Sequence, residues 1–183
     1  DEAARPGESD AVAATIETIE SGVDWPCRVE RRYSRTNLGC RRGVSEAIDW
    51  FFSQVDEGII LEDDCVPHPD FFPYCSELLE RFRGDPRVLC ISGDNSAGVV
   101  PRRGRSYAFV RYPQIWGWAT WQRAWRLYDR DLNRYREARE DGRWNRVVPD
   151  PLERKVMTRR LDRLRTTGEP DTWDYQWVAT ALL

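Results

Sequence analysis

The sequence alternates between segments with a helical spacing of apolar residues and short segments that have the composition of buried strands. Apolar residues recur every three or four positions over 9–22, 36–54 and 70–84, which predicts three amphipathic helices. The strand-like segments are 27–34, 58–62, 87–92 and 106–110. Helices and strands therefore follow one another in turn, and the central strand-like segments are apolar throughout. The sequence predicts an α/β fold, a Rossmann-like sandwich with a mostly parallel sheet and helices on both faces.

The second half of the chain is rich in tryptophan. Trp118, Trp121 and Trp125 fall at the spacing of a helical stripe, which favours core packing for Trp121 and Trp125. Trp116 and Trp118 flank Gly117, where the backbone could approach a ligand closely. For these two tryptophans the sequence leaves core packing and sugar stacking equally open.

Two further helices are predicted near the end of the chain. Asp150 and Glu153 have the spacing of a capping box, with Pro151 at the first helical position, so a helix should run from about Asp150 to Thr166. Residues 173–183 again have an amphipathic pattern, and the chain stops inside it. No opening strand precedes the first helix. We therefore expect residues 1–183 to form a single domain, truncated at both ends and without its first strand.

Composition and charge narrow the classes of function. The formal net charge of −3 argues against general nucleic-acid binding, and no apolar run approaches the roughly 20 residues of a membrane span. The five cysteines have irregular spacing, which predicts reduced thiols and a cytoplasmic protein, with peripheral membrane association left open. Because His68 is the only histidine, a metal ion would have to be held by oxygen ligands.

Three adjacent acids follow the apolar run Gly58–Leu61. Glu62, Asp63 and Asp64 stand where a buried strand is expected to end, and ligands of open parallel sheets bind beyond that end. Alternation along an extended chain would turn Glu62 and Asp64 one way and Asp63 the other. Such carboxylates suit Mg²⁺ or Mn²⁺, which would also bind substrate phosphates. The alternative is that the acids only solvate a loop and cap the next helix.

These motifs resemble glycosyltransferases of the GT-A fold that use nucleotide sugars, especially the inverting N-acetylglucosaminyltransferase I type and its bacterial relatives. The resemblance covers roughly Asn37–Tyr128 and Thr172–Trp177. It depends on a Glu-Asp-Asp triplet, a Pro-Asp-Phe-Phe helix start, an upstream Asn-x-Gly helix, a Gly-Trp turn and a Trp-Asp segment, and the joint pattern is more specific than its parts. It implies metal-dependent, inverting transfer of a hexosyl or N-acetylhexosaminyl group from a nucleotide-sugar donor, expected to be UDP-linked, to a hydroxyl of a glycan or another acceptor.

The resemblance also implies roles for individual residues. Asp64 would bind the metal ion directly, Asp63 would face the ribose and Glu62 the donor sugar. Gly117 and Trp118 would line the sugar site. Asp174 would be the general base, although an aspartate here could simply cap the last helix.

Several alternatives remain at this stage. Arg41 could bind the nucleotide phosphates from the start of its helix, or it could be part of a solvated helix face. Asp94 and Asn95, after the segment 87–92, are weaker candidates for acceptor contacts. The whole chain could also be a nucleotide-sugar-binding module without turnover, or a nucleotidyltransferase on a similar fold.

Overall fold

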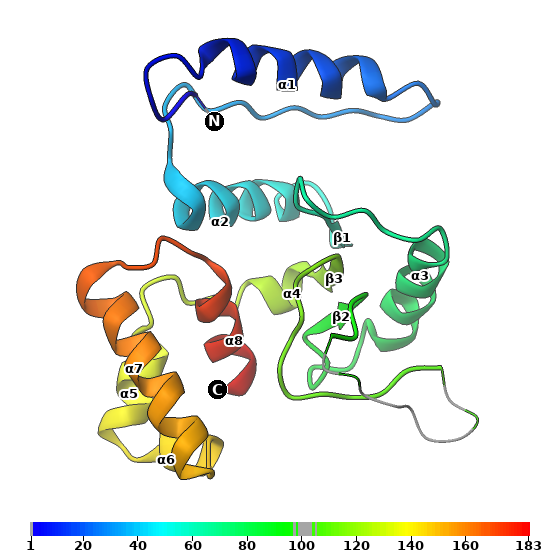
Figure 1. Ribbon diagram of the computed structural model, residues 1–183. Helices are drawn as coiled ribbons and strands as arrows, with labels where there is room; N and C mark the ends of the chain where they lie inside the picture. Colours follow the sequence, from blue (N-terminus) through cyan, green and yellow to red (C-terminus); the bar gives the residue numbers. More distant parts are fainter. Residues whose placement is uncertain (1, 97, 99–103, 105) are drawn as a thin grey trace.

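The computed structural model describes residues 2–96, 98, 104 and 106–183, and most of its regular secondary structure is helical (Figure 1). In order, the elements are α1 (Ser9–Gly22), α2 (Gly39–Phe52), β1 (Glu57–Ile60), α3 (Phe71–Phe82), β2 (Cys90–Ser92), β3 (Trp118–Trp121), α4 (Gln122–Trp125), α5 (Asn133–Glu140), α6 (Arg143–Val147), α7 (Pro151–Thr167) and α8 (Asp174–Leu182).

The sheet contradicts the predicted fold class. It has three short strands in the order β1-β3-β2, and β3 is antiparallel to both neighbours. The predicted strands 27–34 and 106–110 form no ladder. The prediction of a mostly parallel, Rossmann-like GT-A sandwich is therefore wrong for the described residues, which form a helix-rich structure around a small antiparallel sheet.

The error has its origin in the tryptophan-rich segment. Its spacing predicted a helical stripe, but the chain is extended over β3 and turns into a helix only at Gln122. Adjacent residues of a strand point to opposite faces, so Trp118 and Trp121 belong to two different clusters of the core. All four residues of β3 are buried, and the prediction of core positions for Trp121 and Trp125 is confirmed.

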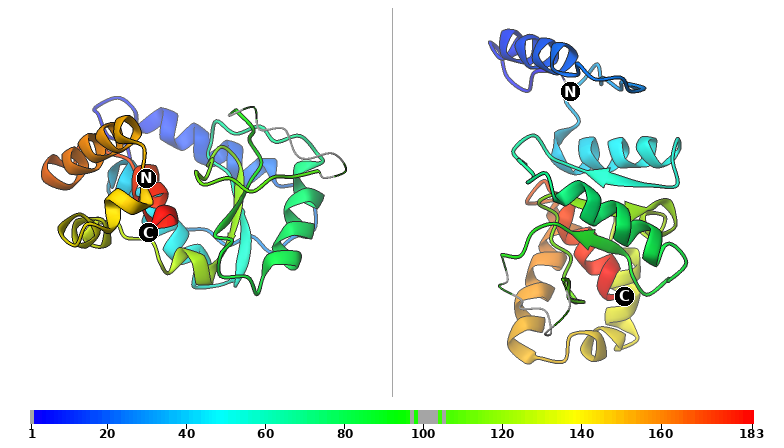
Figure 2. Two further views of the ribbon diagram at one scale, coloured as in Figure 1. Left: turned by 90° about the horizontal axis from the view of Figure 1, so that it is seen from below. Right: turned by 90° about the vertical axis from the view of Figure 1, so that its right-hand side faces the viewer.

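Helices cover both faces of the central strand. On one face, Trp118 packs with Ile48 and Phe52 of α2 and with Trp177 of α8. On the other face, Trp121 packs against α3, and its indole nitrogen donates to the carbonyl oxygen of Leu79 at 3.2 Å. The sheet is thus held between α2 and α8 on one side and α3 on the other (Figures 1 and 2).

A helical unit of α5, α6 and α7 lies beside the sheet and shares α8 with it. Tyr135 of α5 meets Trp144 of α6 edge to face, with ring centroids 4.9 Å apart. The predicted cap of α7 is confirmed, because the Asp150 carboxylate accepts from the Glu153 amide at 2.7 Å and Pro151 is the first helical residue. The sheet with its two flanking clusters forms one core, and α5, α6 and α7 form a second core. Trp177 of α8 packs in the first core and Ala179 of α8 packs in the second, so α8 connects them.

Helix α1 and the extended residues 23–33 lie side by side, apart from both cores (Figure 1). Glu20 holds them together, through an ion pair with Arg31 at 2.5 Å and a hydrogen bond from the Tyr33 hydroxyl at 2.5 Å. Helix α1 has the predicted bounds but no buried residue. Within the described part of the chain, none of the helices combines the length and the apolar character that crossing a bilayer requires.

Candidate active site

The strand order brings three separate segments to one edge of the sheet. Because β1 and β2 are both antiparallel to β3, they run in the same direction, and Ile60 and Ser92 both pair with Trp118. The residues after β1, the residues after β2 and the residues before β3 therefore meet at this edge. A backbone hydrogen bond of 2.8 Å from the Gly93 amide to the Gly117 carbonyl oxygen joins two of the segments.

Glycines permit this close approach. Gly117 has φ +77°, a conformation that disfavours other residues. A Cβ atom at Gly93 would lie 2.3 Å from the Phe71 ring and 3.0 Å from the Gly117 carbonyl oxygen. Gly117, which the resemblance placed beside the sugar, therefore lies at the same edge as the acidic triplet.

The acidic triplet is not extended as the sequence suggested. Strand β1 ends at Ile60, and the Cys65 amide donates to the Glu62 carbonyl oxygen at 3.1 Å, which closes a turn. The expected alternation of the three side chains is therefore wrong. Glu62 is half-buried in this turn, whereas Asp63 and Asp64 are exposed.

The carboxyl group of Glu62 lies within electrostatic reach of Asp174. Burial is the main cause of a raised pKa of Glu62, and the charges of Asp64, Asp174 and Asp63 add to it. A hydrogen bond from the Trp173 indole to Glu62 acts in the opposite direction. The structure therefore brings together the two acidic segments that the sequence singled out, one after β1 and one at the start of α8.

Asp174 does not act as the cap of α8. Trp173 occupies the cap position and no side chain caps the helix there. The Asp174 carboxylate instead accepts a hydrogen bond from the Thr172 hydroxyl through Oδ1, and its side chain is only partly exposed. The capping alternative raised by the sequence is thus not supported, and Oδ2 of Asp174 has no hydrogen bond from the residues that the structure describes.

Asp171 is a structural residue of this site that the sequence analysis missed. Its carboxylate accepts from the backbone amides of Cys40 at 2.8 Å and Arg41 at 3.3 Å, and so caps α2 from a distant loop. Gly39 makes room, because a Cβ atom there would lie 2.3 Å from Oδ2 of Asp171. Burial raises the pKa of the Cys40 thiol, and the charges of Glu62, Asp171 and Asp174 raise it further.

The side chains of two residues predicted to bind the donor pack against other parts of the protein. Trp118 is fully buried, and its ring stacks on Trp173 with centroids 5.6 Å apart, so its side chain is not available to a sugar. The guanidinium of Arg41 lies beside Gly168 at the end of α7, where an added Cβ atom would be 3.3 Å from Nη2. Trp116, by contrast, is 65% exposed at the sheet edge.

A large cleft opens beside the acids. Its volume is about 1180 Å³, and Asp64, Asp94, Trp116 and Gly117 contribute to its wall together with the face of α3 that carries Tyr74. Asp94 makes a local turn in which its carboxylate accepts from the Ser96 amide at 3.1 Å. The residues described include no group of three or more histidine, cysteine or acidic side chains arranged to hold a metal ion.

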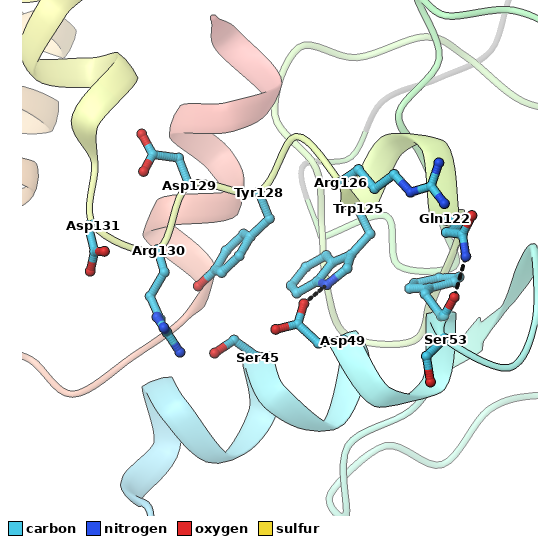
Figure 3. A pocket seen from close by; sticks show the side chains of 11 residues that line it. Ser45, Asp49, Ser53, Gln122, Trp125, Arg126, Tyr128, Asp129, Arg130 and Asp131 are labelled. Atoms are coloured by element: carbon cyan, nitrogen blue, oxygen red, sulfur yellow. Dashed lines mark hydrogen bonds between the residues drawn. The ribbon is translucent and has the colours of Figure 1, made fainter.

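A second hollow of about 430 Å³ lies between α2, α4 and the residues that follow α4 (Figure 3). Here the Trp125 indole donates to Asp49 at 2.7 Å, and Asp129 accepts from the Arg134 amide at 2.6 Å. Some polar groups of this hollow are therefore already hydrogen-bonded to other residues of the protein. None of the site residues predicted from the sequence lines this hollow.

Comparisons of the chain with models of known protein families, with curated proteins and with solved structures give no significant match.

Proposed function

We propose that this protein transfers a sugar from a nucleotide-diphosphate donor, such as a UDP-sugar, to a hydroxyl group of an acceptor, with inversion at the anomeric carbon. The observation that carries the proposal is that Glu62 lies within electrostatic reach of both Asp64 and Asp174, and that Asp64 lines a cleft of about 1180 Å³. The first two residues follow a strand and the third begins a helix far along the chain. Carboxyl groups so distant in sequence, with mutual charge repulsion, favour a catalytic or ion-binding role over solvation of a loop.

The acids fit a divalent cation that needs few protein ligands. Asp63 and Asp64 are exposed. The raised pKa of Glu62 comes mainly from burial, and a cation would offset the charges of Asp64, Asp174 and Asp63 that add to it. Mg²⁺ and Mn²⁺ bind one or two carboxylates and take their other ligands from water and phosphates, which agrees with the lack of a three-ligand group among the described residues. Asp64 would hold the ion, which when bound neutralises the diphosphate and makes it a better leaving group.

Asp174 is the general base of the proposed reaction. In an inverting displacement, the acceptor oxygen attacks the anomeric carbon as the carbon–oxygen bond to the diphosphate breaks. The hydroxyl proton passes to Oδ2 of Asp174, because Thr172 already donates to Oδ1 and so orients the carboxylate. The remaining residues of the edge have a positioning role: Gly117 allows the donor sugar to approach the backbone, and Asp63 faces the nucleotide.

The compartment and the partners are part of the same proposal. All five cysteines are free, which supports a reducing, cytoplasmic location, including the cytoplasmic surface of a membrane. The acidic edge favours a sugar acceptor over a nucleic acid, because phosphate backbones are bound by basic surfaces.

The first test is metal-dependent donor binding. Titration calorimetry of a panel of UDP-sugars with Mn²⁺ should find at least one ligand whose binding is lost on chelation. Asp64→Ala should weaken that binding by at least tenfold, because the ion loses its carboxylate ligand. Unchanged binding in this variant would remove the metal-ligand role of Asp64.

The matched control is Asp56→Ala, which removes the same charge from the opposite end of β1. Asp56 is exposed, and its backbone carbonyl oxygen, not its carboxylate, contacts Gln122, so this variant should bind the donor normally. Product analysis separates the rival activities. Release of a nucleoside diphosphate indicates sugar transfer, release of pyrophosphate indicates nucleotidyl transfer, and binding without any product indicates a binding module.

A further inference from the structure

The wall of the cleft that Asp64 lines carries several exposed apolar side chains. Five large apolar side chains with at least 40% of their surface exposed line it, namely Leu61, Val66, Phe109, Val110 and Trp116. Two of these are aromatic, and both Trp116 and Phe109 are 65% exposed. Apolar side chains exposed together in one hollow, and not scattered over the surface, indicate a binding surface for an apolar group.

Phe109 is held in place by other rings. It meets Phe82 and Tyr107 edge to face, with centroid distances of 5.5 and 5.8 Å, and Phe82 and Tyr107 contact each other at 5.9 Å. Such edge-to-face contacts fix the orientation of a ring. The exposed ring of Phe109 is therefore a preset surface against which a flat ligand can pack.

The charges of the cleft indicate a neutral ligand. Among the described residues that line it, two of the three basic side chains lie beside an acid. Arg87 binds Asp85 at 2.7 Å, Arg111 donates to the Val147 carbonyl oxygen, and His68 lies 3.4 Å from Asp70. Asp64 and Asp94 add negative charge on the same wall. Without a bound metal ion, a phosphorylated or carboxylated ligand would meet the carboxylates of Asp64, Asp70 and Asp94. Among the described lining residues, only the guanidinium of Arg111 is without an ion pair and could offset this repulsion.

We propose that the acceptor is a neutral hydroxyl compound that carries an aromatic group, with the aromatic ring packed against Trp116 and Phe109. Trp116, Phe109 and Asp64 line the same cleft, so a ligand held on the two rings shares this hollow with the Asp64 carboxylate. The role of this ligand as the acceptor rests on the proposed function, whereas the aromatic subsite concerns binding alone.

The test compares two neutral glucosides that differ only in their apolar part. Phenyl β-glucoside and methyl β-glucoside are titrated into the full chain without donor or metal, and binding is followed by saturation-transfer NMR and by tryptophan fluorescence. We expect the phenyl compound to bind at least tenfold more tightly, because only it has a ring to bury. Phenyl phosphate, which adds charge to the same ring, should bind more weakly than the phenyl glucoside.

Variants locate the subsite. Trp116→Ala and Phe109→Ala should each reduce the affinity for phenyl β-glucoside about three- to tenfold. The matched control is Trp25→Ala, because Trp25 is 59% exposed but does not line the cleft, and its loss should leave the affinity unchanged. Trp116→Ala and Trp25→Ala should keep the thermal midpoint of the parent chain, because both side chains are largely exposed. Phe109→Ala should lower the midpoint slightly, because it also loses the ring contacts with Phe82 and Tyr107.

Equal binding of the two glucosides, no detectable binding of either, or an equal effect of Trp25→Ala would overturn the proposal. Concentration-dependent self-association that disappears in Trp116→Ala, without preference for the phenyl compound, would instead identify a protein interface. The two proposals fail separately. If the phenyl compound binds more tightly but no UDP-sugar gives transfer, the aromatic subsite stands and the proposed function is refuted. If both glucosides accept the sugar equally well, the proposed function stands and the aromatic subsite is refuted.

Discussion

At the scale of single residues, the acidic side chains have separate roles that their environments set. Glu62 is half-buried and accepts from the Trp173 indole, so its carboxyl group is partly used within the protein. Asp171 caps α2 and is structural. Asp174 has one oxygen bound to Thr172 and makes no capping bond, which leaves it as the best-placed base.

The Asp174→Asn variant tests this role. Asparagine keeps the size of the side chain and can accept from Thr172, but it cannot take a proton. We expect donor binding to be unchanged and transfer to fall by roughly 100- to 10,000-fold. Steady-state rates with the best UDP-sugar from the panel measure this, and Asp150→Asn at the cap of α7 serves as the control. Near-normal transfer would place the base elsewhere.

At the scale of elements, the site depends on contacts that hold helix and strand ends in position. A hydrogen bond to Asp171 connects the start of α2 with the loop before α8. An ion pair between Glu57 and Arg83 connects β1 with the end of α3. Both ties are polar contacts between segments distant in the sequence. Each can be removed by one substitution that leaves the core untouched.

Gly39→Ala is expected to loosen the start of α2. The glycine has φ +71°, and an added Cβ atom would lie 2.3 Å from the Asp171 carboxylate, so the loss of stability should be about 1–3 kcal/mol. Chemical denaturation measures it. Gly84→Ala is the control, since a Cβ atom there meets nothing within 4 Å, and it should be nearly neutral. Equal effects of both variants would contradict the close approach of Asp171 to α2.

The tie between β1 and α3 should depend on pH. Hydrogen bonds from Arg83, at 2.7 and 2.9 Å, lower the pKa of Glu57 from its ordinary value of 4.5. A lowered carboxyl pKa contributes stability that is fully present above pH 4.5 and is lost as the pH falls through the folded-state pKa. Glu57→Gln should therefore lower the thermal midpoint at pH 7 by a small amount, and the difference from the parent chain should vanish in acid.

Glu137→Gln provides the comparison for that experiment, because Glu137 is exposed on α5 and its side chain has no ion pair among the described residues. Its midpoint should follow that of the parent at every pH. A difference between Glu57→Gln and the parent that persists unchanged however far the pH falls below 4.5 would show that packing, and not charge, holds β1 to α3.

At the scale of the whole molecule, stability is unevenly distributed. The two cores share α8, whereas α1 has no buried side chain and lies apart with residues 23–33 (Figures 1 and 2). An isolated helix of about 12–15 residues is only marginally stable in water. The arrangement therefore predicts independent opening of α1 without loss of the site.

Hydrogen exchange on the full chain tests this. Amides of α1 should exchange within seconds, while those of α8 should be protected to nearly the global free energy of unfolding, because Trp177 and Ala179 anchor α8 in both cores. Mass spectrometry of proteolytic peptides resolves the two helices. Equal protection of α1 and α8 would mean that α1 is covered by a partner in solution.

The helices could be predicted from sequence because their signals are local. The bounds of α1, the cap of α7 at Asp150 and the position of α8 depend on residues within one or two turns of each other. The acids after β1 and Asp174 could also be singled out as candidates. Only the tertiary structure decided that β3 lies between β1 and β2, that Trp118 is buried, and that Asp171 caps α2. Strand partners and distant caps are chosen by contacts between remote segments, and residue spacing within one segment carries no information about them.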